Sequence, residues 1–371
     1  MRSTGQDQHK TSSFWQRVHI DIPLLIGLLC LMTLGLFVVY SASGQEFGIV
    51  VRQMNRIGIS LIVMLAIAQI PPLTYQKWAV PMFVVGVILL ASVLLFGHIG
   101  MGAQRWLKIG FFRFQPSEIM KLVVPIMIAW FISQANLPAK ISTIFYAFIL
   151  VLIPTLLIAK QPDLGTSLLI ASSGIFVIFL AGASWKLITI CVGLGSAFAP
   201  ILWTFLMKDY QKQRVLTFLN PEQDPLGSGY HIIQSKIAIG SGGIHGKGWL
   251  QGTQSQLEFL PEPHTDFIFA VFSEEFGLIG VSVLLFVYML IVMRGLWIAT
   301  NAQHAFTKLL AGSLTLTFFV YVFVNIGMVS GILPVVGVPL PLVSYGGTSM
   351  VTLMAGFGII MAVGTHRRFN V

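Results

Sequence analysis

Long apolar segments recur along almost the whole chain, and each is bounded by charged residues, proline or glycine. A run of about 20 apolar residues is long enough to cross the hydrocarbon core of a bilayer as a helix. The segments that meet this description cover residues 22–40, 54–70, 79–96, 118–132, 142–159, 166–182, 187–207, 275–293, 308–329 and 347–364. The pattern therefore predicts an all-α, polytopic integral membrane protein with about ten transmembrane helices.

The longest interruption of this pattern is the polar segment 208–265. It is the one part of the chain where substantial structure could stand outside the membrane, and its glycines between Gly240 and Gly248 favour a flexible loop. They do not indicate a nucleotide-binding P-loop, because Lys247 is followed by glycine rather than Ser or Thr. We expect a single membrane domain over residues 1–371, with a large extracytoplasmic loop between its seventh and eighth helices.

The composition excludes a soluble fold. Charged residues make up 9% of the 371 residues and hydrophobic residues 56%, whereas an ordinary soluble domain has about 25% charged residues. The two cysteines, Cys30 and Cys191, lie inside apolar segments and are expected to pack as small apolar side chains. The eight histidines lack any spacing typical of a metal site, so we predict no site in which the protein alone holds a metal ion.

The net charge of +9 is spread over the loops and forms no basic domain. This distribution argues against nucleic acid as a partner and fits membrane topology and anionic lipid. An even number of spans places both termini on one side, and Lys and Arg outside the long loop favour the cytoplasm, with ten there against seven opposite. Eleven of the 13 acidic residues then lie on the extracytoplasmic side or at its helix ends. Because both signs of charge gather on one face, we expect a site for a charged substrate there.

The first cluster of candidate residues opens the fourth span, at residues 113–118 (Arg-Phe-Gln-Pro-Ser-Glu). Glu118 and Lys121 are three positions apart, so they share a helix face and can pair. Charges within an apolar segment usually face a protein or water-filled interior. With Arg105 and Arg113 just upstream, we interpret the pair as part of the wall of an anion-binding cavity. The alternative is an interfacial ion pair that anchors the helix.

The second cluster is residues 161–166 (Gln-Pro-Asp-Leu-Gly-Thr), a tight turn between two spans. Asp163 is placed to cap the next helix, since an Asp at a helix start accepts hydrogen bonds from free N–H groups and suits the helix dipole. Capping is one interpretation of Asp163 and substrate contact is the other, and the two do not exclude each other.

The third cluster is residues 260–269 (Leu-Pro-Glu-Pro-His-Thr-Asp-Phe-Ile-Phe), where the long loop re-enters an apolar segment. Asp266 is followed at once by apolar residues and should lie at the membrane boundary, where partial removal of water makes a carboxylate a better base. We therefore predict a catalytic role for Asp266. The alternative is that Thr265 and Asp266 only cap the helix that follows.

The fourth cluster is the apolar segment 331–347, which is too rich in Pro and Gly for a straight helix. Irregular backbone at membrane depth is tolerated only where it is buried in protein or lines a wet cavity. We interpret the segment as a re-entrant loop that forms the floor of the site. A plain extracytoplasmic connection between two helices is the alternative.

Four stretches, at residues 113–118, 161–166, 260–269 and 337–347, together resemble the SEDS family (shape, elongation, division and sporulation) of bacterial wall polymerases. The segment 229–243 is similar to the rod-shape, RodA-type branch. The resemblance implies a ten-helix enzyme of the bacterial cytoplasmic (inner) membrane, with its site on the outer face, that polymerises lipid II into glycan strands. It also implies as partners a class B penicillin-binding transpeptidase and other membrane proteins of the elongation complex.

The resemblance further implies that Asp266 is essential and that Glu118, Lys121 and Asp163 line the same cavity. We expect Asp266 to act as general base on an acceptor sugar hydroxyl, in an inverting transfer with polyprenyl pyrophosphate as leaving group. His264 is expected to bind substrate. Cationic side chains should stabilise the pyrophosphate: Lys121, Arg113, Arg105 and Arg214. No organic cofactor is expected, and a divalent cation (Mg²⁺ or Mn²⁺) could join substrate oxygens to a carboxylate.

Two other functions compete with this hypothesis. A transporter that flips the same lipid would also need many helices and a polar cavity, but it would need polar positions through the full depth of the membrane. A non-enzymatic scaffold of the elongation complex would leave the three carboxylates at residues 118, 163 and 266 without a purpose. The clustering of ionisable residues at one end of the spans favours chemistry at the membrane surface.

Overall fold

The computed structural model describes residues 18–100, 103–109, 112–135, 138–183, 209–224, 227–256 and 263–366, together with positions 189, 193, 203, 204 and 207. Its main helices are α2 (Ile22–Ala42), α3 (Phe47–Ala68), α4 (Pro72–Phe96), α5 (Pro116–Ser133), α6 (Ile141–Lys160), α7 (Leu164–Leu180), α12 (Ile268–Thr300), α13 (Ala305–Val329) and α14 (Thr348–Thr365). Within the described ranges, eight helices are long and apolar enough to cross a membrane, and α7 is shorter but apolar. The predicted class, an all-α multi-pass membrane protein, is confirmed. The span predicted at 187–207 lies outside the described residues.

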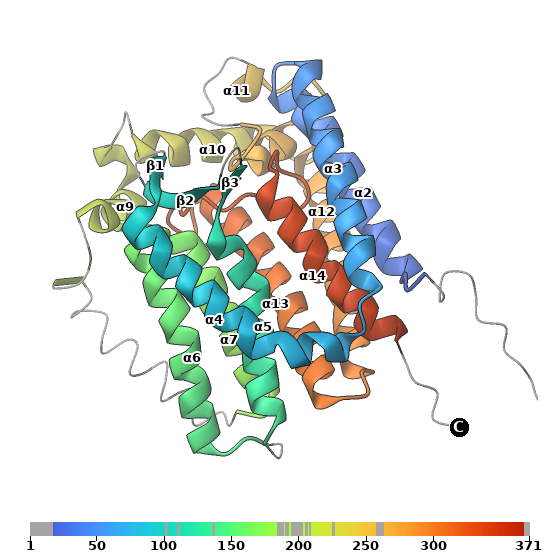
Figure 1. Ribbon diagram of the computed structural model, residues 1–371. Helices are drawn as coiled ribbons and strands as arrows, with labels where there is room; N and C mark the ends of the chain where they lie inside the picture. Colours follow the sequence, from blue (N-terminus) through green and yellow to red (C-terminus); the bar gives the residue numbers. More distant parts are fainter. Residues whose placement is uncertain are drawn as a thin grey trace, which may run out of the picture.

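Three helices form the centre of the bundle. In the apolar windows of α5 and α13, 72% of the residues are buried, and in α14 61% are, against 22–39% in the windows of α2, α3, α4, α6 and α12. Helix α5 packs against α4, α7, α13 and α14 (Figure 1). The outer helices turn their other faces to lipid, so α5, α13 and α14 can carry buried polar groups inside the bundle.

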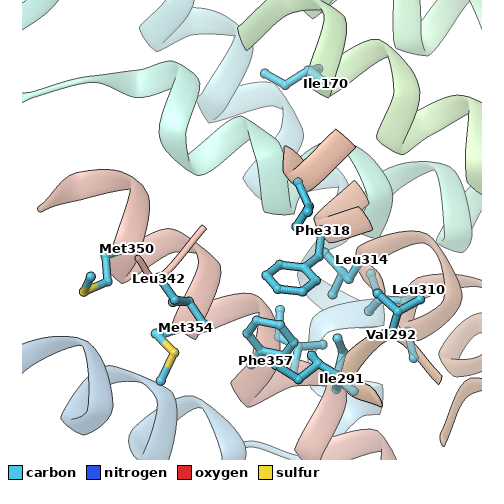
Figure 2. Packing of buried hydrophobic residues seen from close by; sticks show 14 of the residues in the cluster. Ile170, Ile291, Val292, Leu310, Leu314, Phe318, Leu342, Met350, Met354 and Phe357 are labelled. Atoms are coloured by element: carbon cyan, nitrogen blue, oxygen red, sulfur yellow. The ribbon is translucent and has the colours of Figure 1, made fainter. Parts of the chain in front are cut away.

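The apolar core between α12, α13 and α14 is built around aromatic rings. Phe318 of α13 meets Phe357 of α14 edge to face, with ring centroids 4.9 Å apart, and Tyr288 of α12 lies 5.8 Å from Phe318. Figure 2 shows these two phenylalanines beside Leu314 and Ile291. Edge-to-face pairs add specific geometry to apolar burial, and this core fixes α13 against α14.

A small polar layer closes one end of the bundle. A three-stranded antiparallel sheet, β1 (His98–Gly100), β2 (Ala103–Ile109) and β3 (Phe112–Phe114), joins α4 to α5, and it was not predicted. The predicted loop 208–265 contains helices α9 (Asp209–Leu219), α10 (Ser228–Gly242) and α11 (Thr253–Gln256) and the 3₁₀ turn η2 (Pro221–Gln223). Figure 1 shows the sheet, α10 and α11 at one end of the molecule, opposite the start of α2 and the end of α14.

The glycines that we expected to form a flexible loop instead join this layer to α12. Helix α12 is broken at Gly277, whose backbone has φ 63° and ψ −164°. The turn after α10 supplies hydrogen bonds at the break, with Lys247 N 3.0 Å from Glu274 O and Leu278 N 3.0 Å from Gly243 O. A Cβ on Gly246 would lie 2.1 Å from Glu275 O. Gly246 and Gly277 therefore permit close contact between the two backbones.

Two acidic residues of α12, Glu274 and Glu275, are buried by this contact. Glu274 is fully buried and accepts hydrogen bonds from Lys247 Nζ at 2.7 Å and from Gln254 N at 3.0 Å. Glu275 accepts hydrogen bonds from the Ser41 hydroxyl of α2 and, at 3.2 Å, from Leu250 N. The first two turns of α12 are thereby tied both to the polar layer and to α2.

Candidate functional site

The start of α7 and the residues that lead into α12 both contact the segment 331–347, and Gln115, just before α5, contacts Asp163 at the start of α7. A Cβ on Gly165, at the start of α7, would lie 2.8 Å from Val336 O. The hydroxyl of Tyr288 donates to Pro341 O at 2.7 Å, and the amide of Gln53 on α3 donates to Ser344 O at 3.2 Å. Helices on several sides thus satisfy the carbonyls of this non-helical segment. Its burial in protein favours the interpretation as a re-entrant loop.

The ion pair predicted on α5 points into the bundle. Lys121 Nζ lies 2.6 Å from Glu118 Oε1, and the two side chains are 8% and 11% exposed. The ammonium also lies 5.2 Å from the centre of the Tyr321 ring of α13. Beside it is a cavity of about 30 Å³, lined by Lys121, Thr317, Tyr321 and Thr352 and otherwise by apolar residues. This geometry fits an interior cavity wall better than an anchor at the membrane surface.

Asp163 both caps a helix and joins two of the predicted clusters. Its Oδ1 accepts a hydrogen bond from Thr166 N at 3.2 Å, which is the capping interaction. Its Oδ2 lies 3.3 Å from Gln115 Nε2 and 3.7 Å from Arg105 Nε. Arg105, on β2, also donates to Pro162 O at 2.6 Å. Capping therefore uses one carboxylate oxygen, and the other faces a cation and an amide at the start of α5.

Asp266 is not the cap of the helix that it precedes. The N-cap position of α12 is Phe267, and no side chain caps it. Asp266 is partly buried, and a Cβ on Gly337 would lie 3.5 Å from its Oδ2. The carboxylate thus lies against the re-entrant loop, at a glycine with φ 71°. The alternative of a simple cap is not what the geometry supports.

His264, two residues before Asp266, contacts the re-entrant loop at Tyr345. Its carbonyl accepts a hydrogen bond from Tyr345 N at 2.8 Å, and the two rings are 5.6 Å apart, edge to face. The guanidinium of Arg56, on α3, lies 4.2 Å from the centre of the Tyr345 ring. Sequence reasoning missed Arg56, although a charge inside the predicted span 54–70 is a signal for a functional interior.

For two predicted cations, Arg113 and Arg214, the structure gives the position in the fold. Arg113 pairs by its backbone with Lys108 in the β2–β3 ladder, immediately before α5. Arg214 lies on α9, which packs against α10 and η2. None of the hydrogen bonds or ion pairs seen in the described part of the chain joins Arg214 to Asp163 or Glu118. The structure thus brings Arg105 to Asp163, and substrate binding by Arg214 stays a prediction.

The described residues contain no group of three or more His, Cys, Asp or Glu side chains that could hold a metal ion. What the site does contain is a carboxylate at the edge of a re-entrant loop, with paired cations on α5 and β2 and an arginine on α3. Such an arrangement can accept a proton from a bound hydroxyl and can stabilise an anionic group.

Comparisons with known proteins show the family of the chain. The family model described as "Cell cycle protein", which covers FtsW, RodA and SpoVE, matches residues 20–369. Peptidoglycan glycosyltransferase MrdB of Escherichia coli (strain K12) is 58% identical over 362 residues, which are 98% of each chain.

Solved structures show the same fold. A chain of a peptidoglycan synthase complex, from work on the structural coordination of polymerization and crosslinking, has a TM-score of 0.82 and 28% identity, covering 94% of this chain and 99% of that one. Rod shape determining protein RodA of Thermus thermophilus has a TM-score of 0.69 and 26% identity, covering 93% and 96%. The predicted family resemblance is confirmed, and the chain belongs to the FtsW, RodA and SpoVE family.

Proposed function

We infer that the protein is a peptidoglycan glycosyltransferase that polymerises lipid II into β-1,4-linked glycan strands during cell elongation. The observation that carries this inference is the 58% identity, over 98% of both chains, to a protein named peptidoglycan glycosyltransferase. In this proposal Asp266, the Glu118–Lys121 pair and the Asp163–Arg105 pair together supply the site for the chemistry.

In this mechanism the carboxylate of Asp266 takes the proton from the 4-hydroxyl of the acceptor sugar. The acceptor oxygen forms a bond to the anomeric carbon of the donor, and the bond from that carbon to the pyrophosphate oxygen breaks. Inversion of an α-linked donor to a β-1,4 product needs one such base and no covalent intermediate. Because Asp266 lies against Gly337, the re-entrant loop shapes the path by which the acceptor sugar reaches the carboxylate.

Cations stabilise the charge that develops on the polyprenyl pyrophosphate. Lys121 is buried and oriented by Glu118, whereas Arg105 is 31% exposed beside Asp163. Each carboxylate orders its cation before substrate arrives, so little reorganisation is needed in the transition state. Arg113, on β3 just before α5, is the third proposed cation for the pyrophosphate. His264 contributes to sugar binding.

A divalent cation, Mg²⁺ or Mn²⁺, fits this site only if pyrophosphate oxygens supply most of its ligands, with one carboxylate from Asp163 or Asp266. When bound, it would neutralise charge on the leaving group. Organic cofactors have no part in the proposal.

The proposed orientation places both termini in the cytoplasm and the site on the extracytoplasmic face of the inner membrane. The polar layer of β1–β3, α10 and α11 then stands outside the membrane, where a cross-linking partner would act on the new strand. The proposed partners are a class B penicillin-binding transpeptidase and other membrane proteins of the elongation complex. Similarity to a chain of a peptidoglycan synthase complex supports the first of them.

The test is polymerisation of labelled lipid II by the purified protein with its transpeptidase partner, in the presence of a β-lactam that blocks cross-linking. We expect long glycan strands that lysozyme cleaves to disaccharide units. If the folded complex made no polymer but moved labelled lipid II between the leaflets of a vesicle, the protein would be a flippase instead.

A further inference from the structure

Three consecutive backbone carbonyls just before α12 are each held by a donor from elsewhere in the fold. His264 O accepts from Tyr345 N at 2.8 Å, and Thr265 O accepts from the Ser344 hydroxyl at 2.7 Å. Asp266 O accepts from the side-chain amide of Asn325 at 2.9 Å. The first two donors belong to the re-entrant loop, whereas the third comes from the buried face of α13.

Asn325 makes a second hydrogen bond that links this segment to the loop. Its Nδ2 also lies 2.7 Å from Val338 O, and Val338 follows Gly337, the residue next to the Asp266 carboxylate. Asn325 is fully buried. One side chain therefore fixes the backbone that carries Asp266 and, at the same time, the backbone that faces its carboxylate.

The chemistry of the two acceptors explains why this residue is asparagine. Both are carbonyl oxygens, so the NH₂ group must point toward them. A primary amide offers two N–H donors, whereas Ser or Thr offers one and Asp or Leu offers none. Elsewhere on α13, Thr315 and Thr317 donate to carbonyls of their own helix, and Ser313 donates to Ser173 O of α7. Among the described residues of α13, only Asn325 donates both to Asp266 O and to Val338 O of the re-entrant loop.

We infer that Asn325 is a positioning residue for Asp266. It holds the aspartate at the distance from the acceptor hydroxyl that proton transfer requires, and it keeps the loop at Gly337 in register with it. The inference rests on the proposed function, in which Asp266 is the general base. Because a misplacement of about 1 Å can cost about 100-fold in rate, loss of the amide should affect turnover far more than substrate binding.

The test compares Asn325→Leu, which keeps the approximate volume and removes both donors, with Tyr288→Phe as matched control. Tyr288 also donates from a buried side chain to the re-entrant loop, at Pro341 O, but no described hydrogen bond joins it to residues 264–266. With lipid II as substrate, we expect Asn325→Leu to lower kcat about 10- to 100-fold with KM changed less than about twofold. Tyr288→Phe should stay within about twofold of the wild type in both.

Hydrogen exchange gives a readout that does not depend on activity. Peptides covering 263–272 should exchange faster in Asn325→Leu and at the wild-type rate in Tyr288→Phe. Asn325→Gln, which retains the amide on a longer stem, should recover part of kcat. If Asn325→Leu fails to fold, Ser344→Ala, which removes the donor to Thr265 O, should lower kcat at unchanged KM.

The positioning role would be wrong if folded Asn325→Leu turned over at the wild-type rate, or if both variants lost kcat and gained exchange equally. An increase in KM alone would also contradict it. If the wild type made no polymer, the proposed function would fail, but hydrogen exchange would still report whether Asn325 holds the backbone at residues 264–266.

Discussion

At the scale of single residues, two of the buried carboxylates at the polar end pair closely with a cation, whereas Glu275 is held by a hydroxyl and a backbone N–H. Lys121 pairs with Glu118 and Lys247 pairs with Glu274. Removing one partner of a buried pair leaves an uncompensated charge, which costs about 3–5 kcal/mol, whereas replacing both by neutral residues can be almost neutral. Stability and catalysis can therefore be separated at the same pair of residues.

We predict that Lys121→Met lowers the free energy of unfolding by about 3–5 kcal/mol and abolishes polymerisation. The double variant Lys121→Met, Glu118→Gln should regain most of the stability, because no unpaired charge remains, but not the activity, because the leaving group lacks its cation. Thermal unfolding in detergent and lipid II polymerisation measure the two effects. Wild-type polymerisation by the double variant would contradict the role of Lys121.

At the scale of elements, the break in α12 decides where the segment after Asp266 lies. Gly277 has a backbone conformation that is nearly restricted to glycine. A Cβ there would also lie 2.3 Å from Gly246 N. The break and the turn after α10 therefore depend on each other, and together they set the start of α12.

Gly277→Ala should lower the free energy of unfolding by about 1–3 kcal/mol because of backbone strain, and it should reduce polymerisation. Gly58→Ala is the matched control. Gly58 lies on the exposed face of α3 with no atom within 4 Å of an added Cβ, so alanine should be neutral or stabilise the helix by up to about 1 kcal/mol. Equal unfolding temperatures for the two variants would show that the break at Gly277 is unstrained.

The hydrophobic pattern predicted helices but not the contacts that join them. The fourth span was expected at 118–132 and α5 covers Pro116–Ser133, because Pro116 is accommodated in the first turn of the helix. The eighth was expected at 275–293, whereas α12 begins at Ile268. Glu274 and Glu275 interrupt the apolar pattern, and their partners, in residues 247–254 and at Ser41 of α2, are distant in sequence.

In the candidate site, too, some residues could be predicted from the sequence and others could not. Motif residues such as Asp163 and Lys121 could be chosen from the sequence because charges in apolar surroundings are conspicuous. Asn325 and Tyr321 could not, because polar residues inside a long apolar span are often satisfied by their own helix. Their roles depend on which face of α13 meets α5 and the re-entrant loop.

At the scale of the whole molecule, the two ends of the bundle differ. At the end where α2 begins and α14 ends, the His19 and His366 rings stack at 3.5 Å. In addition, Arg294 Nη2 lies 2.7 Å from Asp21 Oδ2. The other end carries the sheet and α10 (Figure 1), and Arg105 of the sheet belongs to the candidate site. A transferase acting on the outer face needs the second end outside.

Single cysteines test this orientation in a variant in which Cys30 and Cys191 are replaced by serine. Asn220→Cys, between α9 and η2, should react with a membrane-impermeant maleimide added to intact spheroplasts, and Asn301→Cys, between α12 and α13, should react only after lysis. Both positions are exposed. Labelling of Asn301→Cys alone from outside would reverse the proposed topology.

The most direct test of the account is the rate of lipid II polymerisation by Asp266→Asn with the transpeptidase partner present. The amide keeps the size of the side chain and removes the base, and Glu222→Gln, an exposed acid on η2, is the matched control. We predict that Asp266→Asn folds normally and loses about 10²–10⁴-fold in kcat, while Glu222→Gln polymerises at the wild-type rate. Wild-type turnover by folded Asp266→Asn would contradict the assignment of Asp266 as the base, and with it the mechanism proposed for this site.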